Sequence, residues 1–449
     1  MSATATNDTQ LASDLEALAG ADKWAFRPWS AREYTHGLFQ YPAMMVPQMQ
    51  RELLVRLRDE GSCSSTYDPF VGSGTALAES MMLGLDFVGV DINPLAVLLC
   101  RAKAGPFFID SLRGACERVC DSAKSDAGRT IELEWRGWRK WFRQDVAIAL
   151  SRLRRSIRAE PQLSNRRFLW VALAETVRLT SNSRTSTVKL HIRPELERKS
   201  RKLDVLWTFE EILSENLKRF ADQRDALDEG GLLERGRYVG KIAIHLHDVS
   251  AGEHPPDDVG HCGILLTSPP YGDNVTTVPY GQHAYLPLQW IDLEDIDPGV
   301  DESFLASTHA IDSMSLGAPT AGALEQVDVL RASSPVLDDV LTALASQPRD
   351  RALRVAAFWR DMDVSIDSIL ASLKAGALMA WTVGNRSVGG NEVPMDAILR
   401  ELLEQRGSSF VTKVERAIPH CRKRMASRNS IASTMSAEQV LVLRAPSNQ

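Results

Sequence analysis

The sequence predicts an α/β fold, in which an open and mostly parallel sheet is interrupted by a basic, mainly helical insertion. Three observations support this prediction. Residues 66–94 have the pattern of a strand, a glycine turn, a helix and a second strand. Residues 263–266 are an apolar run typical of a buried parallel strand. Between these two parts, residues 109–236 show helical spacing and no strand alternation.

The composition bounds the class of protein. The chain has 449 residues, of which 44% are hydrophobic and 24% charged, as in an ordinary globular protein with a large core and two or more structural units. We find no long apolar run and no basic-then-apolar N-terminal signal, so we expect a cytoplasmic protein without a membrane partner. The six cysteines form no CxxC pair, so free thiols are expected and no metal site is predicted.

The N-terminal region precedes the first strand. Residues 1–22 are small and polar with a few leucines, which predicts a poorly ordered or loosely docked tail, and we place the end of this region at residue 35. Tyr41-Pro42 predicts a turn, and the amphipathic stretch from Gln48 to Leu57 predicts a helix.

The glycine turn of residues 66–91 belongs to the first half of a nucleotide-binding unit. Gly72 and Gly74 allow the backbone to pass close to a ligand, and Asp91 ends the second strand, where it is placed to accept hydrogen bonds from both hydroxyls of a ribose. A dinucleotide fingerprint would need a third glycine where this chain has Leu77, so an NAD site is disfavoured. No Gly-Lys-Ser/Thr follows the turn, so a phosphate loop is also disfavoured.

The strand at residues 263–266 runs directly into the turn Ser268-Pro269-Pro270-Tyr271. Two prolines cannot continue a strand ladder and each fixes its own φ, so the chain leaves the sheet in a narrow set of conformations. This rigidity would hold the Ser268 hydroxyl, the Pro269 carbonyl and the Tyr271 ring in a fixed relation. In open α/β sheets, the carboxyl end of such a strand is where ligands bind.

Both turns resemble motifs of one enzyme family. The run Asp68-Pro69-Phe70-Val71-Gly72-Ser73-Gly74-Thr75 is similar to the cofactor motif of the amino-DNA methyltransferases, and Ser268-Pro269-Pro270-Tyr271 resembles their catalytic motif. These enzymes methylate N4 of cytosine or N6 of adenine with S-adenosylmethionine. The resemblance implies a Rossmann-like class I methyltransferase sheet of seven strands, closed by an antiparallel hairpin from Ser409 to Ile418 and from Gln439 to Arg444.

The resemblance also implies a set of site residues. The segment from His36 to Pro47 is similar to the one that packs against the methionine end of the cofactor, and Asp248 has the position of the residue near its adenine amine. The implied cofactor-binding residues are Tyr41, Asp68, Phe70, Gly72, Gly74, Thr75, Asp91, Asn93 and Asp248, and the implied catalytic residues are Ser268, Pro269, Pro270 and Tyr271.

The insertion is strongly basic. Residues 129–205 contain 19 basic and 8 acidic residues, in a chain whose net charge is −6. This asymmetry is typical of a surface that faces nucleic acid, and the polar run Leu179–Thr187 is the best candidate for a loop that meets phosphates or base edges. The alternatives are a solvated helix face or a surface for RNA or an acidic protein.

The remaining elements complete the sheet domain. We expect strands at 241–248 and 377–383, helices at 94–103, 351–373 and 393–405, and a flexible excursion at 292–350. Tyr280, His283, Tyr285 and Trp290 would line a base pocket or pack the strand edge, and the basic connection 422–429 would touch phosphates or be solvated. The predicted divisions are 1–35, 36–108, 109–238 (target recognition) and 239–449.

The resemblance implies methylation of double-stranded DNA by base flipping, with cytosine N4 favoured because the catalytic motif begins with serine. Ser268 and the Pro269 carbonyl would accept hydrogen bonds from the amine while Tyr271 stacks on the base. The alternatives are an N6-adenine DNA methyltransferase, an RNA guanine-N2 methyltransferase and a non-catalytic DNA-binding defence subunit. A cognate restriction or defence component is a further expected partner.

Overall fold

The computed structural model describes residues 3–19, 24, 32–61, 63–133, 135, 137–252, 261–273, 276–300, 302–418 and 437–447. The basic connection at 422–429 lies outside these residues.

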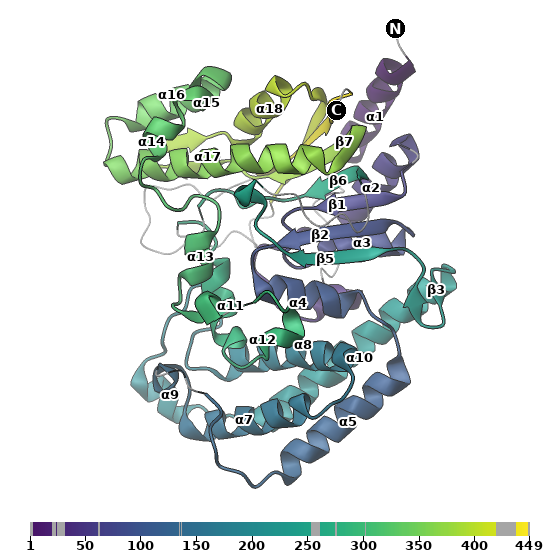
Figure 1. Ribbon diagram of the computed structural model, residues 1–449, viewed down its shortest axis with the longest axis vertical. Helices are drawn as coiled ribbons and strands as arrows, with labels where there is room; N and C mark the ends of the chain where they lie inside the picture. The colour runs from purple at the N-terminus through teal and green to yellow at the C-terminus, as the bar shows by residue number, and fades with distance from the viewer. Residues whose placement is uncertain are drawn as a thin grey trace.

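A seven-stranded sheet forms the centre of the molecule (Figure 1). Its order is β10-β11-β7-β6-β1-β2-β5, with every neighbouring pair parallel except that β11 is antiparallel to both β7 and β10. The predicted methyltransferase-type sheet with a C-terminal antiparallel hairpin is confirmed. The strands are β1 (Ser65–Asp68), β2 (Asp86–Asp91), β5 (Ile242–Leu246), β6 (Cys262–Thr267), β7 (Leu373–Val383), β10 (Ser409–Ala417) and β11 (Ala437–Arg444).

Both faces of the sheet are buried, because successive side chains of a strand point to opposite faces. In β6, Ile264 and Leu266 belong to one hydrophobic core and Leu265 to the other. The first core is covered by α2 (Pro47–Gly61), α3 (Thr75–Met82) and α4 (Pro94–Lys103). The second is covered by α16 (Pro335–Leu344), α17 (Arg349–Ala371) and α18 (Met395–Gln405). The result is a three-layered α/β unit.

The insertion is mainly helical, as the sequence predicts. It consists of α5 (Ile109–Ser125), α6 (Trp138–Trp141), α7 (Gln144–Arg158), α8 (Leu163–Thr180), α9 (Glu195–Ser200) and α10 (Val205–Glu229), followed by the hairpin of β3 (Leu233–Glu234) and β4 (Arg237–Tyr238). Helix α8 packs against α4, and the insertion shares the first hydrophobic core. The insertion therefore extends one layer of the sheet domain (Figure 1). That residues 109–238 form a separate target-recognition domain stays a prediction.

The N-terminal segment is not loosely docked over residues 3–19. These residues form α1 (Ala3–Ala19), which packs against β10 and α2. Leu11 and Leu15 are buried, and the carboxylate of Asp8 lies 2.6 Å from the Arg444 guanidinium. The leucines that make this segment look weakly patterned lie one helical turn apart, and they cover the edge strand of the sheet.

The segment 292–350, predicted to be a flexible excursion, contains short helices. They are α12 (Leu293–Ile296), η4 (Glu302–Leu305), α13 (Ala310–Met314), α14 (Ala323–Gln326) and α15 (Asp328–Ser333), followed by α16. Leu337, Leu341 and Leu344 of α16 are fully or almost fully buried. Helices of four to six residues are too short to produce a periodic hydrophobic signal, which is why the sequence did not indicate them.

The described residues contain other short elements. They are η2 (Tyr34–Gly37), η3 (Val249–Ala251), α11 (Tyr280–Leu288), β8 (Arg386–Val388) and β9 (Asn391–Val393). No helix in the described part of the chain is long and apolar enough to cross a membrane. Within the same ranges, no disulfide joins the cysteines.

The docking of α1 can be tested by Leu15→Ala. Because this side chain has no exposed surface, its truncation should lower the free energy of unfolding by about 2–4 kcal/mol in urea denaturation. The matched control is Ser13→Ala on the exposed side of the same helix, which should change it by less than about 0.5 kcal/mol. Equal effects of the two substitutions would contradict the docking.

Candidate active site

The glycine turn between β1 and α3 depends on positive φ angles. Gly74 has φ 72° at the N-terminus of α3, and a Cβ there would lie 2.9 Å from the Cys100 sulfur. Gly72 has φ 47°, and its amide donates to Asp91 Oδ2 at 2.8 Å. Side-chain-bearing residues rarely adopt such backbone angles, so the turn specifies glycine at both positions.

Asp91 is oriented by backbone amides at the end of β2. Its Oδ2 accepts from Gly72, and its Oδ1 accepts from the Asn93 amide at 2.8 Å. The Asn93 side chain donates to the Tyr41 hydroxyl at 3.2 Å and also caps α4. Burial raises the pKa of Asp91 to about 6, while its hydrogen bonds to the backbone oppose this shift. The carboxylate is thus a fixed acceptor at the base of a pocket.

This pocket gathers many of the predicted site residues. Its walls include Tyr41, Phe70, Gly72, Asp91, Asn93, Asp248, Ser268 and Pro270. Asp248 Oδ1 is bonded to the amide and hydroxyl of Ser250, at 2.9 and 2.7 Å, which fixes the start of η3 beside the pocket. The glycine turn after β1 and the Ser-Pro-Pro-Tyr turn after β6 therefore border one cavity, although they are about 200 residues apart in sequence.

Asp68, Gly74 and Thr75 do not line this pocket but lie within the turn that shapes it. Asp68 is fully buried, and its Oδ1 accepts from the Thr267 hydroxyl at 2.7 Å and from the Phe70 amide at 3.1 Å. The Thr75 hydroxyl lies 3.0 Å from that of Ser73. Direct contact of these three residues with a cofactor stays a prediction, whereas the structure gives them a role in holding the turn.

The Ser-Pro-Pro-Tyr turn, which the sequence predicts to be catalytic, has a pocket side and an outer side. Ser268 Oγ donates to the Tyr271 hydroxyl at 3.3 Å, which in turn donates to Glu438 Oε1 at 3.4 Å. Burial raises the pKa of Tyr271 well above its usual value, so the phenol stays neutral. The Glu438 carboxylate also binds Arg416. This chain of contacts connects the Ser-Pro-Pro-Tyr turn to the C-terminal hairpin.

On its outer side, the turn borders a second, more polar hollow of about 1120 Å³. Ser268, Pro269 and Tyr271 form part of its wall. We call it the substrate hollow, for the role proposed below, and it shares Ala43, Ser268 and Tyr280 with the pocket. Two ligands bound in these neighbouring spaces would meet at Ser268, which is the arrangement that a group-transfer reaction requires.

Several lining residues were not predicted as site residues. They include Met45, Val249, Ile311 and Leu316, together with Tyr280, which the sequence left open between a base pocket and edge packing. Tyr280 stacks on Tyr41 with ring centroids 5.8 Å apart. Ile311 and Leu316 come from the segment interpreted as a flexible excursion, so nothing in the local pattern indicated them. Trp290 is fully buried and packs edge-on against Phe142, away from both cavities.

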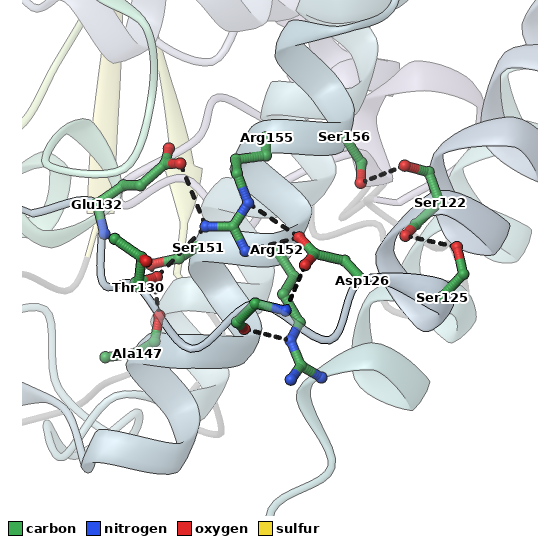
Figure 2. A network of polar contacts seen from close by, with 11 residues as sticks. Ser122, Ser125, Asp126, Thr130, Glu132, Ala147, Ser151, Arg152, Arg155 and Ser156 are labelled. Carbon is green, nitrogen blue, oxygen red and sulfur yellow. Dashed lines mark hydrogen bonds and ion pairs between the residues drawn. The ribbon is translucent and has the colours of Figure 1, made fainter.

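Many basic side chains of the insertion are held in internal contacts. Figure 2 shows Arg155 between Asp126 and Glu132, at 2.6 and 3.2 Å. Other arginines bind the acidic segment that precedes η4: Arg158 pairs with Asp292 at 2.8 Å and Arg166 with Asp295 at 2.7 Å. Further pairs are Arg143–Asp145, Arg178–Glu175, Arg193–Glu197 and Lys199–Glu195. The net charge of the insertion therefore overstates the number of cations open to a ligand.

The polar run Leu179–Thr187 divides into a buried and an exposed part. Asn182 is buried and bonds to the backbone of Trp141 and Lys140, at 2.7 and 3.2 Å. Residues 184–187, with exposed Arg184, line a groove of about 660 Å³ together with Gln40, Tyr41 and Pro42. We call residues 184–187 the groove loop. Tyr41 also lines the pocket at Asp91, which we call the cofactor-type pocket, so the groove loop lies close to the candidate site.

Two known methyltransferases resemble this chain, one along almost its whole length and the other over a short part. It is 32% identical over 439 residues to the type II methyltransferase M.MvaI of Kocuria varians, and the match covers 92% of each protein. It is also 32% identical to the type II methyltransferase M.MjaII of Methanocaldococcus jannaschii over 81 residues, which are 18% of this chain and 15% of that protein. No family model and no solved structure matches the chain.

Because Asp68 is buried, we expect the free energy of unfolding to depend on pH. Burial raises the pKa of Asp68 from 3.8 to about 7. Because the folded state binds this proton more tightly, the contribution of protonated Asp68 to the free energy of unfolding is fully present below pH 3.8. This contribution is lost as the pH rises through about 7. From pH 5 to 8, the unfolding free energy should fall by roughly 1–3 kcal/mol more in the wild type than in Asp68→Asn. Parallel pH profiles would contradict this assignment.

Proposed function

Since this chain belongs to the type II DNA methyltransferases, we propose that it transfers a methyl group from S-adenosylmethionine to the N4 amine of cytosine in double-stranded DNA. The observation that carries the proposal is the position of Ser268 on the wall that the cofactor-type pocket and the substrate hollow share. The serine at the first position of the catalytic motif favours cytosine over adenine.

The chemistry of the pocket fits S-adenosylmethionine. Its acidic side chains are Asp91 and Asp248, whose carboxylates suit ribose hydroxyls and an adenine amine, and Phe70 and Val249 offer apolar surface to an adenine ring. When bound, the cofactor supplies an electrophilic methyl group. Tyr41, Met45 and the glycine turn would enclose its remaining part.

The target amine would be activated by acceptors on the catalytic turn. The Ser268 hydroxyl and the Pro269 carbonyl accept hydrogen bonds from the exocyclic amine, so that its nitrogen lone pair turns away from conjugation with the ring. The Tyr271 ring stacks on the extruded base, a contact worth about 1–3 kcal/mol, which offsets part of the cost of flipping the nucleotide. The amine becomes acidic only after methylation, and its proton then passes to water, directly or by way of the Ser268 hydroxyl, which gives up its own proton as it accepts this one. Rate enhancement would come mainly from positioning.

The groove loop supplies a second part of the proposal. Arg184, Ser186 and Thr187 are exposed, and Lys189 follows them. Guanidinium, ammonium and hydroxyl groups are the usual partners of DNA phosphates. We therefore assign DNA backbone contact to this loop of the insertion, which borders the active site, rather than to the paired arginines of α7 and α8.

The proposed reaction is tested by transfer of a tritiated methyl group from S-adenosylmethionine to unmethylated duplex DNA and, in parallel, to total RNA. Nucleoside mass analysis should find N4-methylcytosine in the DNA. N6-methyladenine would overturn the choice of base, and label confined to RNA would overturn the choice of substrate.

Ser268→Ala should lower kcat by at least about 10²-fold, because it removes an acceptor at the reacting amine. Its affinity for S-adenosylmethionine, measured by calorimetry, should change little. The matched control is Ser346→Ala, an exposed serine after α16, which should keep wild-type activity. Wild-type kcat in Ser268→Ala would exclude the proposed role of this hydroxyl.

Asp91→Ala, in contrast to Ser268→Ala, should change the affinity for the cofactor. It should weaken binding of S-adenosylmethionine by roughly 10- to 100-fold, as expected for the loss of a charged acceptor that is held by two backbone amides. Unchanged affinity in calorimetry would mean that the cofactor lies elsewhere.

If the groove loop binds phosphates, Arg184→Ala and Lys189→Ala should each weaken DNA binding and reduce the slope of log K against log salt by about 1. Lys199→Ala is the matched control, since Lys199 is exposed but paired with Glu195 at 2.6 Å. A slope that falls equally in the control would assign the effect to general charge.

A further inference from the structure

A small hairpin follows the strand next to the catalytic strand. Its first strand, β8, follows β7 after a link of two residues, and the two-residue turn Gly389-Gly390, which joins β8 to β9, has φ of 61° and 88°. Positive φ at both central positions is typical of a tight hairpin turn. The hairpin therefore starts at the carboxyl edge of the sheet, beside the Ser-Pro-Pro-Tyr turn.

One side of the hairpin is docked against the catalytic turn. Arg386 lies 3.3 Å from Asp273 Oδ2, and a Cβ on Gly272, the residue after Tyr271, would overlap its guanidinium. At the tip, the Gln347 side-chain amide donates to the Gly389 carbonyl at 3.0 Å. The hairpin is thus fixed at both ends, with Arg386 against the turn that would hold the target base.

The other side of the hairpin is open. Ser387 and Glu392 are cross-strand partners, as are Arg386 and Val393. Because successive residues of a strand alternate between its faces, Ser387 and Glu392 share the face opposite to Arg386 and buried Val393. Glu392 is exposed and accepts from the Asn385 side chain at 3.2 Å. This open face presents the partly exposed hydroxyl of Ser387 and the exposed carboxylate of Glu392.

The lining of the substrate hollow has charges of both signs. Three arginines of this wall, at positions 351, 354 and 386, are accompanied by the carboxylates of Asp273, Asp350, Glu392 and Glu415. A surface for phosphates alone would be mainly basic. Base edges present donors as well as acceptors, and carboxylates accept hydrogen bonds from exocyclic amines. The mixed lining fits base edges better than a phosphate backbone.

We propose that the β8–β9 hairpin is a second target-recognition element, whose open face contacts the base edges of nucleotides next to the target base. This inference rests on the proposed function, since it needs DNA at the substrate hollow. The groove loop borders Gln40, Tyr41 and Pro42, and Ala43 borders the hollow beneath the hairpin. The segment 40–43 thus lies between the two elements, and target recognition is shared between the insertion and the catalytic half.

The test uses a duplex DNA library of random sequence, methylated by the full-length enzyme and sequenced to map the modified sites. Glu392→Gln keeps the size of the side chain but replaces a carboxylate by an amide, and Ser387→Ala removes the hydroxyl. Each should relax or change the preference at one base position by roughly 5- to 100-fold, while the affinity for S-adenosylmethionine stays at its wild-type value. Glu325→Gln, an exposed glutamate of α14, is the matched control and should keep the wild-type preference.

Two failures are distinguishable in this experiment. If the wild-type enzyme methylates no DNA, the proposed function fails. If the wild type methylates a defined sequence and both hairpin variants keep that sequence and their KM for DNA, the hairpin proposal fails alone. A variant that also loses affinity for S-adenosylmethionine would show that the hairpin acts on the fold of the site, which would likewise overturn its recognition role.

Discussion

A buried hydrogen bond from the Thr267 hydroxyl to the Asp68 carboxyl group joins the ends of the two central strands. The strands β1 and β6 are in parallel register, with Thr66 beside Ile264, so their carboxyl ends lie at the same edge of the sheet. The glycine turn leaves from one strand and the proline turn from the other. The remainder of the site depends on this adjacency, because it places the cofactor-type pocket and the substrate hollow on two sides of Ser268.

The insertion contributes to the same site in a way that its net charge does not reveal. Some of its arginines, among them Arg158 and Arg166, bind the acidic segment at 292–297, and others form ion pairs within the insertion. Trp170 also donates to Asp295, at 2.7 Å. These contacts fix the insertion against the catalytic half, so the exposed groove loop has a defined position beside Tyr41.

The parts of the site that could be predicted from sequence are those in which a residue type is required by the local backbone conformation. Gly72 and Gly74 occupy positions with positive φ, which favour glycine, and Pro269 and Pro270 end a strand because proline cannot continue the ladder. Each of these features can be recognised in the sequence without knowledge of the fold. The contributions of Ile311 and Leu316 could not be predicted, since Ile311 lies in the short helix α13 and Leu316 just after it, and both reach the pocket only through tertiary packing. The ion pairs of the insertion were missed for a related reason, because Arg166 and Asp295 are 129 residues apart. The docking of α1 likewise depends on an edge strand near the other end of the chain.

The central claim is that a methyl donor and a flipped base meet at Ser268. A crystal structure of the enzyme with a non-reactive S-adenosylmethionine analogue and duplex DNA tests it most directly. The account predicts that the analogue lies over Asp91 and Phe70, and that the target amine lies within hydrogen-bonding distance of Ser268 Oγ and the Pro269 carbonyl. A target base that stays stacked in the duplex, or an analogue bound outside the pocket between the two turns, would contradict it.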